Sequence, residues 1–114
     1  GAEKTISVAM PAPLRPGMTV VDLGCGAGLD TRIAAERVSP GGRVAGVDFS
    51  MEMLRRASPG RGASFVQAAA ESLPFRDAFA DMVLINGLLN LNPYRERILR
   101  EVARILKPGG ALFG

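Results

Sequence analysis

Residues 20–28 read VVDLGCGAG, an apolar run that leads directly into three glycines at alternate positions, Gly24, Gly26 and Gly28. A continuous apolar run is typical of a strand that is covered on both faces. Because glycine has no Cβ atom, the backbone can turn tightly there and a ligand can approach the main chain closely. The stretch therefore predicts a buried strand, a glycine turn and a ligand site at the start of the following helix.

The composition limits the kind of protein that this sequence encodes. A chain of 114 residues, 47% of them hydrophobic, suffices for one hydrophobic core. Its single cysteine excludes an internal disulfide, which fits a cytoplasmic location, and no apolar run is long enough for a membrane span. Histidine is absent, so no metal site is expected. The net charge of +3 comes from arginines spread along the chain, and we expect no nucleic-acid partner.

Helical and strand-like stretches alternate along the chain. A helical stripe of apolar side chains spans residues 29–38, and Ser50 is suited to cap a short helix over residues 50–57. A longer helix follows Asn92, with Pro93 at its first position. The expected strands, numbered one to five in this order, are residues 18–23, 43–47, 64–67, 81–85 and 111–113.

This alternation predicts an α/β fold, a doubly wound parallel sheet between two layers of helices. If strands two and three stack on one side of strand one, and strands four and five on the other, the strand order is 3-2-1-4-5. Ligands in such sheets bind where the winding direction reverses, beyond the carboxyl ends of the strands. The glycine turn, Asp48, residues 68–71 and residues 86–90 are expected at those ends.

The two ends of the sequence give weaker signals. Residues 4–10 are expected to form a short helix that ends at Pro11, so we assign residues 1–18 to a helical or linker segment and residues 19–114 to the domain. A sheet that stops just after the fifth strand begins would leave that strand as an unprotected edge. We therefore expect either a truncated part of a longer enzyme or a homodimer formed through this edge.

Asp48 indicates a nucleoside ligand. It closes the second strand roughly 20 residues after the glycine turn, where a carboxylate can accept hydrogen bonds from both ribose hydroxyls. A dinucleotide fingerprint would read GxGxxG, but the sixth position is Leu29 when counted from Gly24 and Thr31 when counted from Gly26. The pattern here is DxGxGxG, which leaves the nucleoside unidentified.

Five stretches in order resemble the class I S-adenosylmethionine-dependent methyltransferases. They are VVDLGCGAG (20–28), VAGVDFSMEML (44–54), AESLPF (70–75), DMVLINGLLNLNP (81–93) and ILREVARILKPGG (98–110). Within that family the chain is most similar to type 11 enzymes, the branch that includes the ubiquinone/menaquinone-biosynthesis and arsenite methyltransferases. The resemblance implies a Rossmann-like fold, S-adenosylmethionine as cofactor and methyl transfer to a small-molecule acceptor.

The resemblance also implies roles for single residues in cofactor binding. Asp48 would bind the ribose hydroxyls, and Phe49 and Met51 would contact the adenine face. The methionine end would be held by Asp22, Gly24, Cys25, Gly26 and Gly28.

The remaining implied contacts concern the adenine edge and the methyl group. Ala70 would offer its backbone N–H to the adenine edge, with Glu71 beside it. Asn86 and Gly87 would line the wall near the transferable methyl. The family commonly has an Asp just before Ala70, where this sequence has Ala69, so one polar contact to the adenine is missing. No catalytic residue is assigned, because displacement from a sulfonium often needs no strong base.

Three further interpretations bear on the reaction. The arsenite enzymes hold their substrate with cysteine thiols after the fourth strand, where this sequence has Gly87 and Leu88, so the resemblance does not extend to arsenic chemistry. A nicotinamide-dinucleotide oxidoreductase domain is one alternative to methyl transfer. A nucleoside-binding or interaction module without activity is the other.

Overall fold

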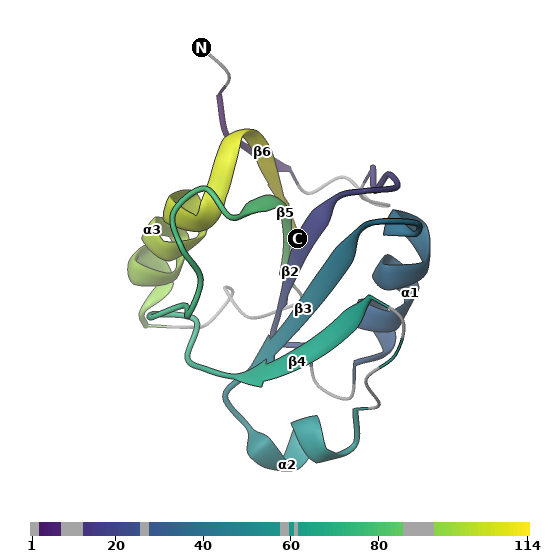
Figure 1. Ribbon diagram of the computed structural model, residues 1–114. Helices are drawn as coiled ribbons and strands as arrows, with labels where there is room; N and C mark the ends of the chain where they lie inside the picture. Colours follow the sequence, from purple (N-terminus) through teal and green to yellow (C-terminus); the bar gives the residue numbers. More distant parts are fainter. Residues whose placement is uncertain (1–2, 8–12, 26–27, 58–59, 61, 86–92) are drawn as a thin grey trace.

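The computed structural model describes residues 3–7, 13–25, 28–57, 60, 62–85 and 93–114 (Figure 1). In this part of the chain six strands form one parallel sheet in the order β1-β6-β5-β2-β3-β4. The strands are β1 (Thr5–Ser7), β2 (Thr19–Leu23), β3 (Arg43–Asp48), β4 (Ala63–Gln67), β5 (Ala80–Ile85) and β6 (Leu106–Phe113). The helices are α1 (Leu29–Val38), α2 (Met51–Arg55) and α3 (Arg95–Ile105).

The predicted strand order is confirmed. Strands one to five of the sequence are β2, β3, β4, β5 and β6, and their spatial order is 3-2-1-4-5. Val21 of β2 pairs with Ala45 of β3 on one side and with Val83 of β5 on the other. The winding direction therefore reverses between β2 and β5, and the carboxyl ends of the central strands meet at one edge of the sheet.

The sheet is covered on both faces, which confirms the three-layer arrangement. On one face Val20 of β2 packs with Ala34 and Val38 of α1. On the other face Val21 of β2 belongs to a second cluster with Ile98 of α3. Figure 1 shows α1 and α3 on opposite sides of the sheet. The unbroken apolar run of β2 follows from this double burial, since successive residues face opposite layers of helices.

The short helix expected over residues 4–10 is not formed in the part of this segment that the structure describes. Thr5–Ser7 form a strand, not a helix, and Thr5 pairs in parallel with Ala111 of β6. The main chain of this segment gains its strand pairing from the edge of β6, and the Lys4 ammonium donates a hydrogen bond to the Ala103 carbonyl of α3. Because β1 covers the edge of β6, the homodimer expected through that edge loses its basis.

The connection from α3 to the last strand also differs from expectation. The helix begins at Arg95, with Pro93 and Tyr94 in the turn before it, and Asn92 lies outside the described residues. β6 begins at Leu106, directly after the helix, and therefore includes the stretch 106–110 ahead of the expected strand of residues 111–113. Its register against β5 shifts between the pairs formed by Ala80 and Met82, which accommodates this stretch. No helix within the described residues is long and apolar enough to span a membrane.

Candidate functional site

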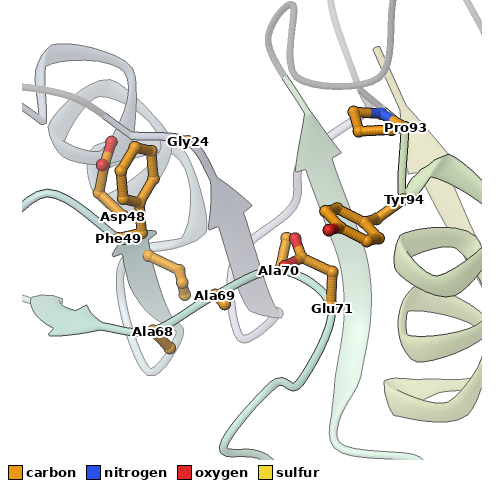
Figure 2. A pocket seen from close by; sticks show the side chains of 10 residues that line it. Gly24, Asp48, Phe49, Ala68, Ala69, Ala70, Glu71, Pro93 and Tyr94 are labelled. Carbon is orange, nitrogen blue, oxygen red and sulfur yellow. The ribbon is translucent and has the colours of Figure 1, made fainter. Parts of the chain in front are cut away.

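A pocket of about 400 Å³ opens at the carboxyl ends of β2, β3 and β4 (Figure 2). Segments that are far apart in the sequence converge on it, as expected for the point where the winding direction reverses. The described residues that line it are Gly24, Val47, Asp48, Phe49, Ala68, Ala69, Ala70, Glu71, Pro93 and Tyr94.

The glycine turn is fixed to the end of β3. The backbone N–H groups of Gly24 and Cys25 both donate to the Val47 carbonyl, at 2.8 and 3.1 Å, and Gly28 N–H donates to the Cys25 carbonyl at 2.9 Å. Gly24 has a φ of 70°, a left-handed conformation that favours glycine. Gly26 lies outside the described residues. Since the first two amides of the turn already have an acceptor, they hold the turn against β3 instead of facing a ligand.

Asp48 is hydrogen-bonded to the start of α2 and to the start of the loop after β4. Its Oδ1 accepts a hydrogen bond from Ser50 N–H at 2.9 Å, and its main-chain carbonyl accepts one from Ala68 N–H at 3.1 Å. The Ser50 hydroxyl in turn accepts from Met53 N–H at 3.3 Å, which confirms the predicted cap of α2. Ser50 N–H thereby orients the Asp48 carboxylate at the pocket wall, and Ala68 N–H holds the main chain of Asp48.

Two exposed aromatic side chains flank the pocket. Phe49 is 72% exposed and lies with Asp48 on one side, whereas Tyr94, 53% exposed, lies with Pro93 on the opposite side (Figure 2). Exposed rings at a pocket rim offer flat apolar contact surface to a planar ligand. Met51, also expected to contact adenine, is exposed but is not among the lining residues.

The wall formed by Pro93 and Tyr94 is not predicted by the sequence pattern. The pattern places Pro93 at the first position of the helix and gives Tyr94 no role in the site. The strand topology could have indicated this wall, because the chain leaves β5 toward α3 at the same edge of the sheet as the glycine turn.

Two predicted cofactor residues, Asp22 and Cys25, are not among the residues that line the pocket. Asp22 is only 2% exposed and accepts a hydrogen bond of 2.7 Å from the Thr31 hydroxyl of α1. Burial raises the pKa of Asp22 to about 6. Burial also raises the pKa of the Cys25 thiol to about 11, with the negative charges of Asp22 and Asp48 adding to the effect. Cys25 is therefore protonated at neutral pH and is not an activated nucleophile.

Gly28 is likewise absent from the pocket lining, and its surroundings give a packing reason for a glycine. A Cβ atom at Gly28 would lie 2.6 Å from the Phe65 ring, and one at Gly46 would lie 2.8 Å from the same ring. Gly28 also has a φ of 86°. Both glycines make room for Phe65 of β4 between the turn, β3 and α1.

The structure thus brings five of the twelve predicted residues together at one pocket: Gly24, Asp48, Phe49, Ala70 and Glu71. Asp22, Cys25, Gly28 and Met51 lie beside or beneath it, and Gly26, Asn86 and Gly87 fall outside the described residues. Within the described part of the chain, no three His, Cys, Asp or Glu side chains are grouped as metal ligands would be. The site offers the carboxylates of Asp48 and Glu71, apolar walls and main-chain groups.

Comparison with known proteins adds a family to this geometry. A family model described as "Methyltransferase domain" matches residues 21–114. The arsenite methyltransferase of Halobacterium salinarum is 37% identical over 105 residues, which are 87% of this chain and 27% of that protein. The ubiquinone/menaquinone biosynthesis C-methyltransferase UbiE of Bordetella avium is 40% identical over 108 residues, 90% of this chain and 42% of that protein.

Solved structures give the same result. The crystal structure of CrArsM, an arsenic(III) S-adenosylmethionine methyltransferase from Chlamydomonas reinhardtii, matches with a TM-score of 0.83 and 32% identity, over 94% of this chain and 41% of that chain. This chain spans less than half the length of each of these three proteins.

Proposed function

Because the chain belongs to the methyltransferase-domain family, we propose that it binds S-adenosylmethionine in the pocket beyond β2, β3 and β4 and serves methyl transfer to a small-molecule acceptor. The observation that carries the proposal is the placement of Asp48 at the wall of that pocket, next to the glycine turn. A carboxylate at the end of a buried strand, beside a glycine turn, is suited to a ribose.

The residues of the pocket fit this cofactor. A volume of about 400 Å³ is in the range of small-molecule sites. In our proposal Asp48 accepts hydrogen bonds from the ribose hydroxyls, Phe49 packs on the adenine, and Ala70 lies at the adenine edge. The methionine end lies over the turn at Gly24. Ala69 offers no side-chain oxygen to the adenine amino group, and losing one such hydrogen bond weakens binding by ~1 kcal/mol.

The cofactor would supply the chemistry, because its sulfonium makes the methyl group transferable by in-line displacement. The acceptor would form the new bond to the methyl carbon while the electrons of the S–CH₃ bond return to sulfur. The chain's own residues bind and orient. Alignment of two reactants accounts for a large part of the rate of such a reaction. We assign no general base among the described lining residues.

The acceptor is proposed from the relatives and from the single thiol. One relative is named for arsenite and another for ubiquinone/menaquinone biosynthesis. Cys25, the one cysteine of this sequence, does not line the pocket and has its pKa raised to about 11. We therefore favour an organic acceptor over arsenite, and a screen of labelled methyl transfer to phenols, quinols and amines tests this choice.

Titration calorimetry with S-adenosylhomocysteine and, separately, with NAD tests the cofactor. We expect binding of the first only. Asp48→Asn keeps an oxygen for Ser50 N–H but removes the charge offered to the ribose, so the affinity is expected to fall by about 10- to 100-fold, the effect of a hydrogen bond to a charged group. Glu36→Gln, an exposed carboxylate on α1, is the matched control. Preferential NAD binding, or wild-type affinity of Asp48→Asn, contradicts the proposal.

A further inference from the structure

One wall of the pocket is a loop without helix or strand. Residues 68–79 connect β4 to β5, and Ala68, Ala69, Ala70 and Glu71 at its start line the pocket. Irregular segments of this length are generally more mobile than the elements that they connect. A ligand held by such a wall requires something that fixes the loop.

The first anchor lies at the upstream end of the wall. Ala68 N–H donates to the Asp48 carbonyl at 3.1 Å, and Ser72 N–H donates to the Ala69 carbonyl at 3.1 Å, which closes a tight turn. The wall is thus tied to β3 where it begins. At its downstream end the Leu73 side chain is buried in the core cluster that includes Ile98 of α3, but the main chain of Leu73 needs a second, polar anchor.

That second anchor comes from α3 and acts on Leu73. Leu73 N–H donates to Glu101 Oε1 at 2.8 Å, and the Leu73 carbonyl accepts from Arg104 Nη2 at 3.0 Å. Glu101 and Arg104 are themselves paired, with Arg104 Nε 2.7 Å from Glu101 Oε2. Both main-chain groups of one loop residue are therefore held by one ion pair, which we name the Glu101–Arg104 clamp.

The clamp also holds the rest of the loop. Arg104 Nη1 donates to the Phe75 carbonyl at 2.8 Å and lies 2.9 Å from Asp77 Oδ1. The clamp side chains are only partly exposed, 32% for Arg104 and 19% for Glu101. Hydrogen bonds from the Arg104 guanidinium lower the pKa of Glu101, so its carboxylate stays charged.

The geometry suits arginine and not lysine. A guanidinium is planar and presents five donors in a fixed arrangement, so it can bind a carboxylate and two carbonyls at once. A lysine ammonium is a compact charge on a flexible stem and cannot reach these acceptors in the same way. Neither clamp residue lines the pocket, so any effect on a ligand passes through the loop.

We propose that the Glu101–Arg104 clamp is a positioning device for the nucleoside side of the pocket, because it fixes Leu73 immediately after the lining residues Ala70 and Glu71. The proposal rests on the proposed function for its ligand. In this proposal α3 contributes to cofactor affinity in addition to covering one face of the sheet.

Arg104→Lys tests the clamp, with Val38→Ala as the control for lost stability. Val38 of α1 is fully buried in the other core cluster, which includes no residue of the loop, so its truncation destabilises the fold without releasing Leu73. We expect Arg104→Lys to weaken S-adenosylhomocysteine binding by about 5- to 20-fold and adenosine binding by the same factor. Val38→Ala should bind both ligands within about twofold of wild type.

Hydrogen exchange separates failure of this proposal from failure of the proposed function. In the ligand-free protein, Arg104→Lys should speed exchange of the Ala70–Leu73 amides by at least about tenfold and leave the β2 amides unchanged. Arg100→Lys, whose partner Glu96 lies 3.9 Å away on the exposed face of α3, should change neither group. Unchanged loop exchange, or a loss of affinity equal in Arg104→Lys and Val38→Ala, overturns the clamp proposal. Absence of S-adenosylhomocysteine binding in the wild type overturns only the proposed function.

Discussion

Asp22 combines burial with a polar partner supplied by the helix that follows the glycine turn. It lies on the α1 face of β2, as Val20 does, and Thr31 is the residue of α1 that reaches it, at 2.7 Å. Thr31 is itself fully buried. The pair therefore links the strand to the first turn of α1, directly beneath the backbone that we propose for the methionine end of the cofactor.

The raised pKa of Asp22 predicts a specific pH dependence of stability. Because its pKa is about 6 in the folded protein and 3.8 ordinarily, the folded state binds more protons between these values, and its contribution to stability falls as the pH rises from about 4 to about 6. Asp22→Asn removes this titration. Relative to wild type, the variant should gain about 2 kcal/mol in unfolding free energy between pH 4.5 and pH 7.5, measured by urea denaturation.

Thr31→Val provides the comparison for that experiment. It removes the hydroxyl that favours the charged carboxylate, so its stability should fall more steeply over the same pH range than that of the wild type. A pH profile of Asp22→Asn parallel to that of the wild type would show that Asp22 titrates normally.

At the scale of elements, one aromatic ring joins β4 to β3 and α1. Phe65 of β4 occupies the space that Gly46 of β3 and Gly28 leave open, since a Cβ at either glycine would come closer than 3.0 Å to the ring. The two glycines are nearly 20 positions apart in the sequence and serve the same ring. For Gly46, close packing and not ligand contact is the reason for a glycine.

Gly46→Ala tests this packing. The added Cβ would lie 2.8 Å from Phe65 Cδ1 and 2.8 Å from Thr31 Oγ1, and overpacking of this kind costs about 1–3 kcal/mol of unfolding free energy. Gly60→Ala is the control, because its Cβ would meet no atom within 4 Å. Combining Gly46→Ala with Phe65→Leu should recover part of the loss in a double-mutant cycle. Additive effects of the two substitutions would contradict the contact.

The central elements could be predicted from the sequence because local and tertiary preferences agree there. The strand at the apolar run of β2, the helix over residues 29–38 and the cap at Ser50 are all observed, although Ile33 of that helix is exposed. β1 could not be predicted, since three residues acquire a strand conformation only from the partner edge of β6. The start of α3 was misplaced for a related reason: Pro93 can begin a helix, but here it serves the turn before it.

At the scale of the whole molecule, the sheet has its carboxyl-end pocket at the centre and β1 at one edge. The sequence predicted the convergence of Gly24, Asp48 and residues 68–71, because strand order alone brings these segments together. It did not predict the Glu101–Arg104 clamp. The clamp joins segments about 30 residues apart. In a sequence, the charged residues of an amphipathic helix indicate only its solvent-exposed face.

Deletion of residues 1–7 tests the role of β1 in the whole sheet. The deletion removes a short parallel ladder, for which we expect a loss of roughly 1–3 kcal/mol from its hydrogen bonds. It also exposes the edge of β6, so the variant should associate with rising concentration in sedimentation velocity. Deletion of residues 1 and 2 alone leaves β1 intact and is the control. A monomer with an unchanged melting temperature would show that β1 contributes nothing to the sheet.

The place of β1 also has a consequence for the order of events when the protein is made. Thr5 pairs with Ala111, so the first and the last strand of this sheet in chain order are neighbours in space. Closing so long a loop costs chain entropy before any contact is gained. Since the β1–β6 pair closes the longest loop among the strand pairs of this sheet, we expect it to form after β2 to β6 have assembled.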